Sequence, residues 1–332
     1  LIVCLLCGCS ARHDGDNSID IDLTTVDVDS IPFSQIMDSV SYLSLELPDS
    51  IVVGRIKDIS FEDSMIVILD KYANNVIKIS RDGKYIGQIG SKGNGPGEYI
   101  SADALCTDKS HVYIYDRMQR SVIRYDHNGN YIGKDSIGAA EDFAKIDIDG
   151  QPHYLSALYN AQPEKSGIFL WNAADGSRKL RGCLDDTPCN HAWEIFSGNG
   201  QISVMTRDYE NIVYNWSGDS LAMELDLKVT PRPTKREVEN WLPKNIWEHF
   251  TRACHYDTGR WFICDYWRGN EPCTVIIDKK TGKTIRTHGL YNDFDSTEVV
   301  QGLPIAIDNA LIFVDDSTDD NKLQLQFRHL KR

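Results

Sequence analysis

MIVILDKYANNVIKISRDGKYIG, residues 65–87, and HVYIYDRMQRSVIRYDHNGNYIG, residues 111–133, align without a gap at an offset of 46 residues. Asp70 falls on Asp116, and Tyr85-Ile86-Gly87 falls on Tyr131-Ile132-Gly133. Self-similarity at a fixed period of this length is typical of repeat architectures, in which each copy is one supersecondary unit. The fold can therefore be worked out from one copy and extended along the chain.

Each copy predicts a run of antiparallel strands. Ile66 and Ile68 alternate with other residues, which indicates a strand with one buried face. A polar loop and a second apolar stretch, 76–79, follow, and Asp82-Gly83 then supplies the positive φ of a tight hairpin turn. Residues 85–89 return as an outermost strand, and 56–60 precede the unit as an innermost one. One copy therefore predicts a four-stranded antiparallel meander.

Weaker copies continue toward the C-terminus, with turn signals at Asp175-Gly176, Ser217-Gly218 and Thr281-Gly282. The last interval is too long for one copy. Its excess falls on TKREVENWLPKNIWEHFTRAC, residues 234–254, whose apolar spacing predicts one or two short helices inserted between the fourth and fifth units. A final unit, 303–328, shows only three strands, and we expect VSYLSLEL, 40–47, to supply its missing outer strand.

Six such meanders arranged radially make an all-β, six-bladed β-propeller of four-stranded antiparallel blades, in which a closed ring leaves no open sheet edge. A β-sandwich does not require a fixed repeat, so the period favours the propeller. The chain has 332 residues, of which 41% are hydrophobic and 25% charged. All-β folds of this size are often one domain, and we assign residues 18–332 to a single propeller.

The glycine-rich stretch GSKGNGPGEYI, residues 90–100, lies between the first two copies. A phosphate-binding loop would require a Lys-Ser/Thr pair after its glycines, and none follows here. The stretch is therefore interpreted as a shaped connector from the outer strand of the first blade to the inner strand of the second.

The N-terminal residues LIVCLLCGCS form a short apolar run that ends in Cys7-Gly8-Cys9. They are interpreted as a truncated secretion signal, 1–9, that is too short to span a membrane, followed by a polar tether, 10–17. The ending resembles a bacterial lipobox, which implies that Cys9 is the lipidated residue and that the membrane is contacted through a lipid anchor only. The family pattern prefers Ala, Ser or Thr where Cys7 stands.

The connector 90–100, the strand HVYIYD and the hairpin SVIRYDHNGNYIG together resemble the NHL-type repeat. With the lipobox and the DSVSYLSLE entry at 38–46, they resemble the six-bladed propeller lipoproteins of gut Bacteroidota, a family that is mostly of unassigned function. The resemblance implies the fold and a place in the cell envelope, at the outer membrane. Gln119 and Ser121 stand where the NHL loop commonly has Asn and Arg.

The net charge is −14 and the isoelectric point about 5.0. Such a surface repels phosphate backbones, so nucleic acid is not expected as a partner. Six cysteines fall in the predicted propeller: Cys106, Cys183, Cys189, Cys254, Cys264 and Cys273. Three interpretations remain open for them, namely buried free thiols, a Cys183–Cys189 disulfide, and a zinc cluster that includes His191.

The loops between the second and third strand of each blade are expected to open on the same face as the connectors. An aspartate recurs there, at Asp70, Asp116, Asp265 and Asp315, and its simplest role is to cap a turn. Aromatic and cationic side chains accompany it and suit stacking on a sugar or gripping a partner protein. The predicted ligand-binding set is Tyr72, Arg117, Tyr159, Arg207, Tyr209, Tyr266, Trp267 and Arg268.

No nucleophile elbow, HExxH motif or Walker loop is present in the sequence. The sequence therefore favours a binding or scaffold module for a glycan or a partner protein, with no cofactor and no catalytic residue. The alternative is a metal-dependent lyase or lactonase that holds calcium or zinc in the central channel. For that alternative the candidate ligands on the inner strands are His153, His255 and Asp103.

Overall fold

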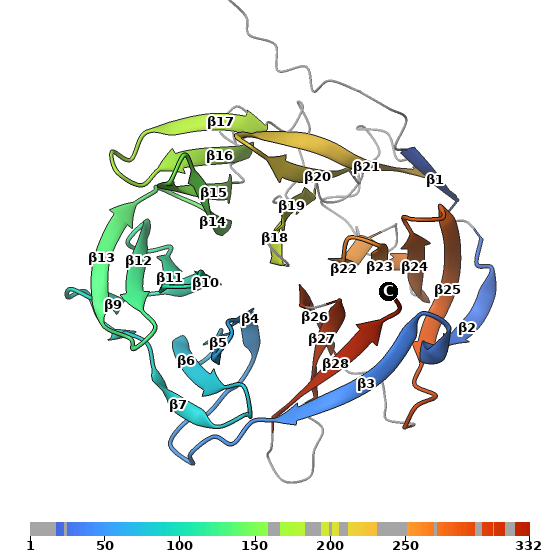
Figure 1. Ribbon diagram of the computed structural model, residues 1–332, viewed down its shortest axis with the longest axis horizontal. Helices are drawn as coiled ribbons and strands as arrows, with labels where there is room; N and C mark the ends of the chain where they lie inside the picture. Colours follow the sequence, from blue (N-terminus) through green and yellow to red (C-terminus); the bar gives the residue numbers. More distant parts are fainter. Residues whose placement is uncertain are drawn as a thin grey trace, which may run out of the picture.

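A computed structural model describes residues 18–22, 25–158, 167–182, 194–198, 201–205, 212–230, 251–268, 271–295, 301–307, 309–315 and 323–332. Six sheets stand radially around one axis, each with its first strand innermost (Figure 1). The predicted six-bladed β-propeller with mostly four-stranded antiparallel blades is confirmed.

The first three blades are simple meanders in chain order. Blade 1 contains β4 (Ile56–Phe61), β5 (Met65–Asp70), β6 (Asn75–Ser80) and β7 (Tyr85–Gln88). Blade 2 contains β10 (Ala102–Thr107), β11 (His111–Asp116), β12 (Ser121–Asp126) and β13 (Tyr131–Ser136). Blade 3 contains β14 (Asp142–Ile148), β15 (Gln151–Leu158), β16 (Gly167–Asn172) and β17 (Arg178–Gly182).

The last three blades each add a strand from the N-terminal segment. Blade 4 contains β18 (Glu194–Gly198), β19 (Gln201–Met205), β20 (Ile212–Ser217), β21 (Ser220–Thr230) and then β1 (Ser18–Asp22). Blade 5 contains β22 (Thr251–Asp257), β23 (Trp261–Arg268), β24 (Glu271–Asp278), β25 (Lys283–Tyr291) and then β2 (Val28–Pro32). Blade 6 contains β26 (Gln301–Ile307), β27 (Ala310–Asp315), β28 (Gln324–Leu330) and then β3 (Met37–Ser44).

Ring closure is as predicted, because β3 pairs antiparallel with β28, from Ser44 opposite Gln324 to Met37 opposite Leu330. The strand is shifted toward the N-terminus relative to the predicted 40–47. The parallel pairings of β1 with β21 and of β2 with β25 were not predicted. The N-terminal segment therefore follows the outside of three successive blades before the first complete blade begins.

The hydrophobic core lies between neighbouring blades. Every residue of β5 is buried, which corrects the expectation of one buried face. Ile66 and Ile68 belong to the cluster shared with blade 6, whereas Val67 and Leu69 belong to the cluster shared with blade 2. A sheet that is covered on both faces loses the alternation that marks a half-exposed strand. The predicted hairpin glycines all have positive φ: Gly83, Gly129, Gly176, Gly218 and Gly282.

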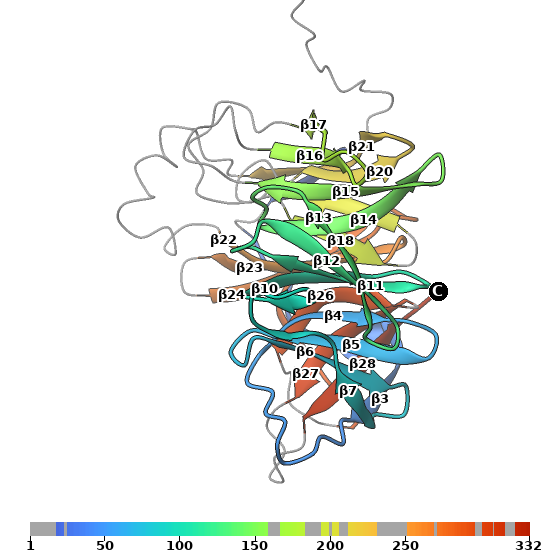
Figure 2. The same ribbon diagram turned by 90° about the vertical axis from the view of Figure 1, so that its left-hand side faces the viewer.

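The two ends of the propeller differ in what they carry. At one end lie the connectors between blades and the loops between the second and third strands, which we call the connector face. At the other end, the hairpin face, lie the turns between first and second strands and between third and fourth strands. Figure 2 shows the propeller from the side, with the C-terminus at the hairpin face.

The predicted helical insert at 234–254 is not supported. Its last four residues, 251–254, form the start of strand β22, and residues 234–250 lie outside the described residues. The part of the chain that the structure describes contains no α-helix and one short 3-10 turn, η1 (Phe33–Gln35). No helix in that part is long and apolar enough to cross a membrane. Cys106, Cys264 and Cys273 are buried, whereas Cys9, Cys183 and Cys189 lie outside the described residues.

Candidate functional site

Buried aspartates hold the loops of the connector face in blades 1 and 2. Asp116 accepts hydrogen bonds from the backbone N–H groups of Ile100, at 2.6 Å, and Gln119, at 2.9 Å. Asp70 does the same in blade 1, accepting from the N–H groups of Gly54 and of Ala73, the latter at 2.7 Å. Both side chains are fully buried. In these two blades the recurring aspartate is therefore a structural cap that ties a loop to the connector beside it.

A further contact joins the two blades on this face. Asn74 donates from Nδ2 to the carbonyl of Ile100 at 3.0 Å, and its Oδ1 accepts from the N–H of Ala102 at 2.8 Å. The loop of blade 1 is thus fixed directly to the connector that enters blade 2. Asn74 has a φ of 49°, a left-handed conformation that asparagine tolerates better than most residues.

Close packing accounts for the glycines of the connector, and the connector is not interpreted as a ligand-binding loop. Ser91–Lys92 pairs in parallel with Glu98–Tyr99, and Glu98 Oε2 accepts from the N–H of Gly95 at 2.8 Å. A Cβ on Gly93 would lie 2.0 Å from Glu98 Oε2. One on Gly97, whose φ is +74°, would lie 2.9 Å from the Cβ of Tyr131. The loop's own side chains and the edge of blade 2 occupy the space that larger residues would need.

Large apolar side chains are exposed on the same loops. Their exposed fractions are 70% for Val52, 70% for Tyr72, 44% for Ile100 and 67% for Met118. Tyr72 and Met118 occupy equivalent positions 46 residues apart in the repeat, next to the equivalent cations Lys71 and Arg117. We call the exposed residues of segments 51–55, 71–74, 100–101 and 117–120 the blade 1–2 patch.

Charged groups also gather toward the axis beside this patch. Asp103, on the innermost strand β10, accepts from Ser101 Oγ at 2.7 Å and lies 3.4 Å from Lys57 Nζ and 3.6 Å from Arg117 Nε. The predicted ligand-binding Arg117 and the predicted metal ligand Asp103 are thus brought together as an ion pair. Lys57 and Arg117 thus balance the negative charge of Asp103.

Two further carboxylates on innermost strands were missed by the sequence analysis. Asp58 accepts from the N–H of Leu105 in blade 2 at 2.9 Å, and Asp142 accepts from the N–H of Ile195 in blade 4 at 3.0 Å. Each carboxylate therefore links its own inner strand to that of the next blade. Burial raises the pKa of Asp58 to about 7, and the carboxylate of Asp142 adds to the rise. The inter-blade role has no signature in the local sequence.

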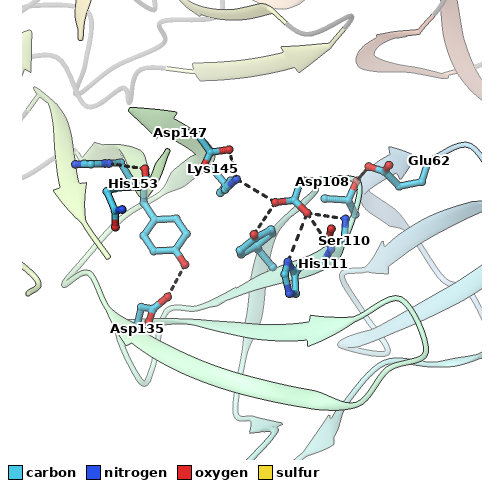
Figure 3. Close-up of polar contacts among 12 residues, drawn as sticks. Glu62, Asp108, Ser110, His111, Asp135, Lys145, Asp147 and His153 are labelled. Atoms are coloured by element: carbon cyan, nitrogen blue, oxygen red, sulfur yellow. Dashed lines mark hydrogen bonds and ion pairs between the residues drawn. The ribbon is translucent and has the colours of Figure 1, made fainter. Parts of the chain in front are cut away.

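A second polar cluster lies on the hairpin face, between blades 2 and 3 (Figure 3). Lys145 Nζ lies 3.0 Å from Asp108 Oδ2 and 2.5 Å from Asp147 Oδ2, and Tyr113 donates to Asp108 at 2.7 Å. Burial alone would raise the pKa of Asp108, but hydrogen bonds from Tyr113 and from backbone N–H groups outweigh it and lower that pKa to about 2.

Burial alone would lower the pKa of Lys145, but the two carboxylates raise it. The amine is thus kept protonated, and a protonated amine has no lone pair with which to act as a nucleophile. The cluster is therefore a structural ion network between blades.

A family model described as "Domain of unknown function (DUF4934)" matches residues 17–323. The chain belongs to the DUF4934 family. The DUF4934 chain is similar in structure to a "Putative exported protein" from Bacteroides fragilis NCTC 9343, with a TM-score of 0.74 and 16% identity over 95% of this chain and 100% of that one. It is also similar to a member of the DUF4221 family from Bacteroides vulgatus, with a TM-score of 0.58 and 9% identity over 89% of this chain and 98% of that one. These likenesses show the fold alone. No curated protein matches the chain.

The predicted ligand-binding residues of this DUF4934 chain have different fates. Tyr72 and Arg117 are exposed on the connector face as expected. Tyr266 is buried, with 1% of its surface exposed, which corrects its placement as a rim aromatic. Trp267 and Arg268 belong to strand β23, opposite Pro272 and Glu271, and not to a loop. Tyr159, Arg207 and Tyr209 lie outside the described residues.

The predicted metal ligands are not brought together. His153 lies on the second strand of blade 3, not the innermost, and its Nδ1 contacts the carbonyl of Gln151 at 3.0 Å on the hairpin face. His255 is on innermost strand β22, in blade 5, and Asp103 is on β10, in blade 2. Across the described residues, no three His, Cys, Asp or Glu side chains are grouped as a metal site requires.

Proposed function

We propose that this chain is an exported cell-envelope lipoprotein whose propeller acts as a binding module, with its ligand at the connector face. The observation that carries the proposal is the blade 1–2 patch, in which large apolar side chains are exposed on loops that buried aspartates hold in place. Exposed apolar side chains that gather on one face mark interaction sites in soluble proteins. Rigid loops lower the entropy lost on binding.

Export and the lipid anchor rest on the N-terminal sequence and on the likeness to the Bacteroides fragilis protein described as a "Putative exported protein". We propose that Cys9 carries the lipid and that the protein belongs to the outer membrane. Metabolic labelling with an alkynyl fatty acid tests this, because the label should be lost in Cys9→Ala. Label retained by the variant would contradict the assignment.

The alternative, a metal-dependent enzyme at the axis, gains no support from the described residues. Asp103 is paired with Arg117 and Lys57, and Asp58 and Asp142 accept backbone hydrogen bonds. These three carboxylates are thus engaged in contacts between neighbouring blades.

The repeat provides a matched test of the binding face. Tyr72→Ser with Met118→Ser removes two apolar side chains from the connector face, at equivalent positions of two blades. Ile86→Ser with Ile132→Ser removes two apolar side chains from the outer strands of the same blades, also at equivalent positions and about half exposed. Ligands selected from glycan and peptide libraries against the parent protein should lose affinity for the first double variant only. Ligands that respond to the second variant and not to the first would place the site on the outer rim instead.

A further inference from the structure

We propose that the blade 1–2 patch binds a polypeptide segment that is acidic and carries apolar side chains. The inference rests on the proposed function, since it names the partner of the same face. It is argued from the kinds of side chain in the patch, from their charge and from the way the loops are held.

The apolar side chains of the patch favour a polypeptide over a sugar. Sugars stack on the flat faces of aromatic rings, and Tyr72 is the one aromatic side chain among the four large apolar groups. Val52, Ile100 and Met118 offer aliphatic and thioether surface, which packs against aliphatic and aromatic side chains of a protein. Tyrosine, methionine and arginine are also the residue types that protein interfaces prefer.

The charge of the patch is opposite to that of the chain. Segments 51–55, 71–74, 100–101 and 117–120 contain four cations and no acidic residue; the cations are Arg55, Lys71, Arg117 and Arg120, all exposed. The whole chain carries a net charge of −14. Three neighbouring carboxylates are engaged, because Asp70 and Asp116 accept backbone hydrogen bonds and Asp103 pairs with Lys57 and Arg117. The exposed Asp49 lies outside these segments, two residues before Ile51.

A local cationic surface on an acidic protein selects a partner by its length as well as by the sign of its charge. A short acidic segment gains the attraction of Arg55, Lys71 and Arg120, with Arg117 already paired to Asp103, and it does not meet the acidic remainder of the surface. A long polyanion such as a nucleic acid extends past the patch and is repelled there. Acidic residues on the partner also steer it to this face and away from the rest of the propeller.

The loops are held before any partner arrives. The N–H groups of Ile100 and Gln119 are bound to Asp116, those of Gly54 and Ala73 to Asp70, and Asn74 joins the two blades. The patch therefore presents its side chains from a fixed backbone, which suits recognition of an extended segment with modest ordering cost.

Short synthetic peptides of three matched kinds test the inference on the folded, unlipidated chain. The first kind combines glutamate with leucine and phenylalanine, the second replaces glutamate by lysine, and the third replaces the apolar residues by serine. We expect binding of the first kind only, measured by interferometry, with an affinity that falls as salt is raised. Equal binding of the lysine peptides, or no binding of the acidic apolar peptides, would overturn the inference.

Charge-reversal variants localise the binding. Arg55→Glu with Lys71→Glu should weaken the acidic apolar peptides by about tenfold or more, equivalent to about 1.4 kcal/mol. Lys109→Glu with Lys283→Glu changes the net charge equally on exposed residues at the hairpin face, and should change affinity by less than about twofold. Equal loss in the two double variants would show a general charge effect and refute the patch.

The results separate this inference from the proposed function. If Tyr72→Ser with Met118→Ser abolishes binding of library-selected ligands while the charge reversals do nothing, the binding face stands and the acidic partner fails. If neither pair matters, both fail. A different result would be that the parent protein binds no peptide but binds vesicles that contain phosphatidylserine, with that binding abolished in Arg55→Glu with Lys71→Glu. This result would make the partner an anionic membrane and overturn the inference.

Discussion

Replacing Asp116 by alanine tests the claim that buried carboxylates hold the connector-face loops. The side chain accepts three hydrogen bonds, from the N–H groups of Ile100 and Gln119 and from Gln119 Nε2. Gln119 Nε2 keeps its second partner, the carbonyl of Glu98, at 3.0 Å. Two backbone donors therefore lose their acceptor, and a buried unsatisfied donor costs about 1–3 kcal/mol. We expect Asp116→Ala to lower the free energy of unfolding by about 3 kcal/mol.

Asp126→Ala is the matched control within the same blade. Asp126 accepts hydrogen bonds from the N–H and from Nδ2 of Asn130, at 2.8 Å each, but it is half-buried at the hairpin face. Water can replace those bonds, so we expect a much smaller loss than for Asp116→Ala. Urea denaturation followed by tryptophan fluorescence measures both variants, with the change taken from the midpoint at constant slope. Losses that agree within error for the two variants would refute the assignment of Asp116 as the group that holds the loop.

Three further predictions concern other parts of the propeller. Asp58 has a raised pKa in the folded protein, so the folded state holds its proton to higher pH than the unfolded chain does, and stability is lost as pH rises from about 4 to about 7. Asp58→Asn should therefore be more stable than the parent protein, and the difference in the free energy of unfolding should grow by at least about 1.4 kcal/mol between about pH 5 and pH 8. A difference that stays constant with pH would contradict the raised pKa. Deletion through Pro32 removes β1 and β2, whereas deletion through Ser44 also removes β3 and opens blade 6. Calorimetry should therefore show a much lower melting temperature for the longer deletion. Equal melting temperatures would argue against closure of the ring by β3. Gly97→Ala and Gly150→Ala both place alanine at a φ above +70°, but only the first brings its Cβ within 3 Å of another residue. Gly97→Ala should therefore lower the free energy of unfolding, measured in denaturant, by about 1–3 kcal/mol more than Gly150→Ala. Equal losses would show that the connector moves to accommodate the added methyl group.

The propeller could be predicted because local sequence patterns define its repeat. Asp82-Gly83 and Asn128-Gly129 fix hairpin turns through backbone preferences of single residues, and a gapless offset then sets the blade period. The parallel strands β1 and β2 could not be predicted in this way. Ser18–Asp22 and Val28–Pro32 pair with strands more than two hundred residues away, and no turn signal connects them to those strands.

The site was harder to predict than the fold, for related reasons. Tyr266 and Tyr72 follow aspartates at similar repeat positions, yet one is buried and the other exposed, because β23 continues to Arg268 while β5 ends at Asp70. One extended hairpin moves an aromatic residue from the rim into the sheet. Asp58 and Asp142 act between blades, and such pairings depend on the distance between inner strands, which the sequence does not specify.

The use of a strand from the start of the chain to complete blade 6 also bears on the order of events during synthesis. Gln324 donates from Nε2 to Ser44 Oγ at a sequence separation of 280 residues, so β3 emerges from the ribosome long before β28 exists. Contacts between distant parts of a chain form slowly, because loop closure must precede them. Until then β3 is an unpaired strand, and unpaired strands invite association with other chains. A nascent chain that stops before residue 324 can never complete its ring, so a fragment would present two open edges to proteases and chaperones. Because β3 and β28 are so far apart in the sequence, the ring can close only after β28 has been synthesised, which makes closure of blade 6 a late step of folding.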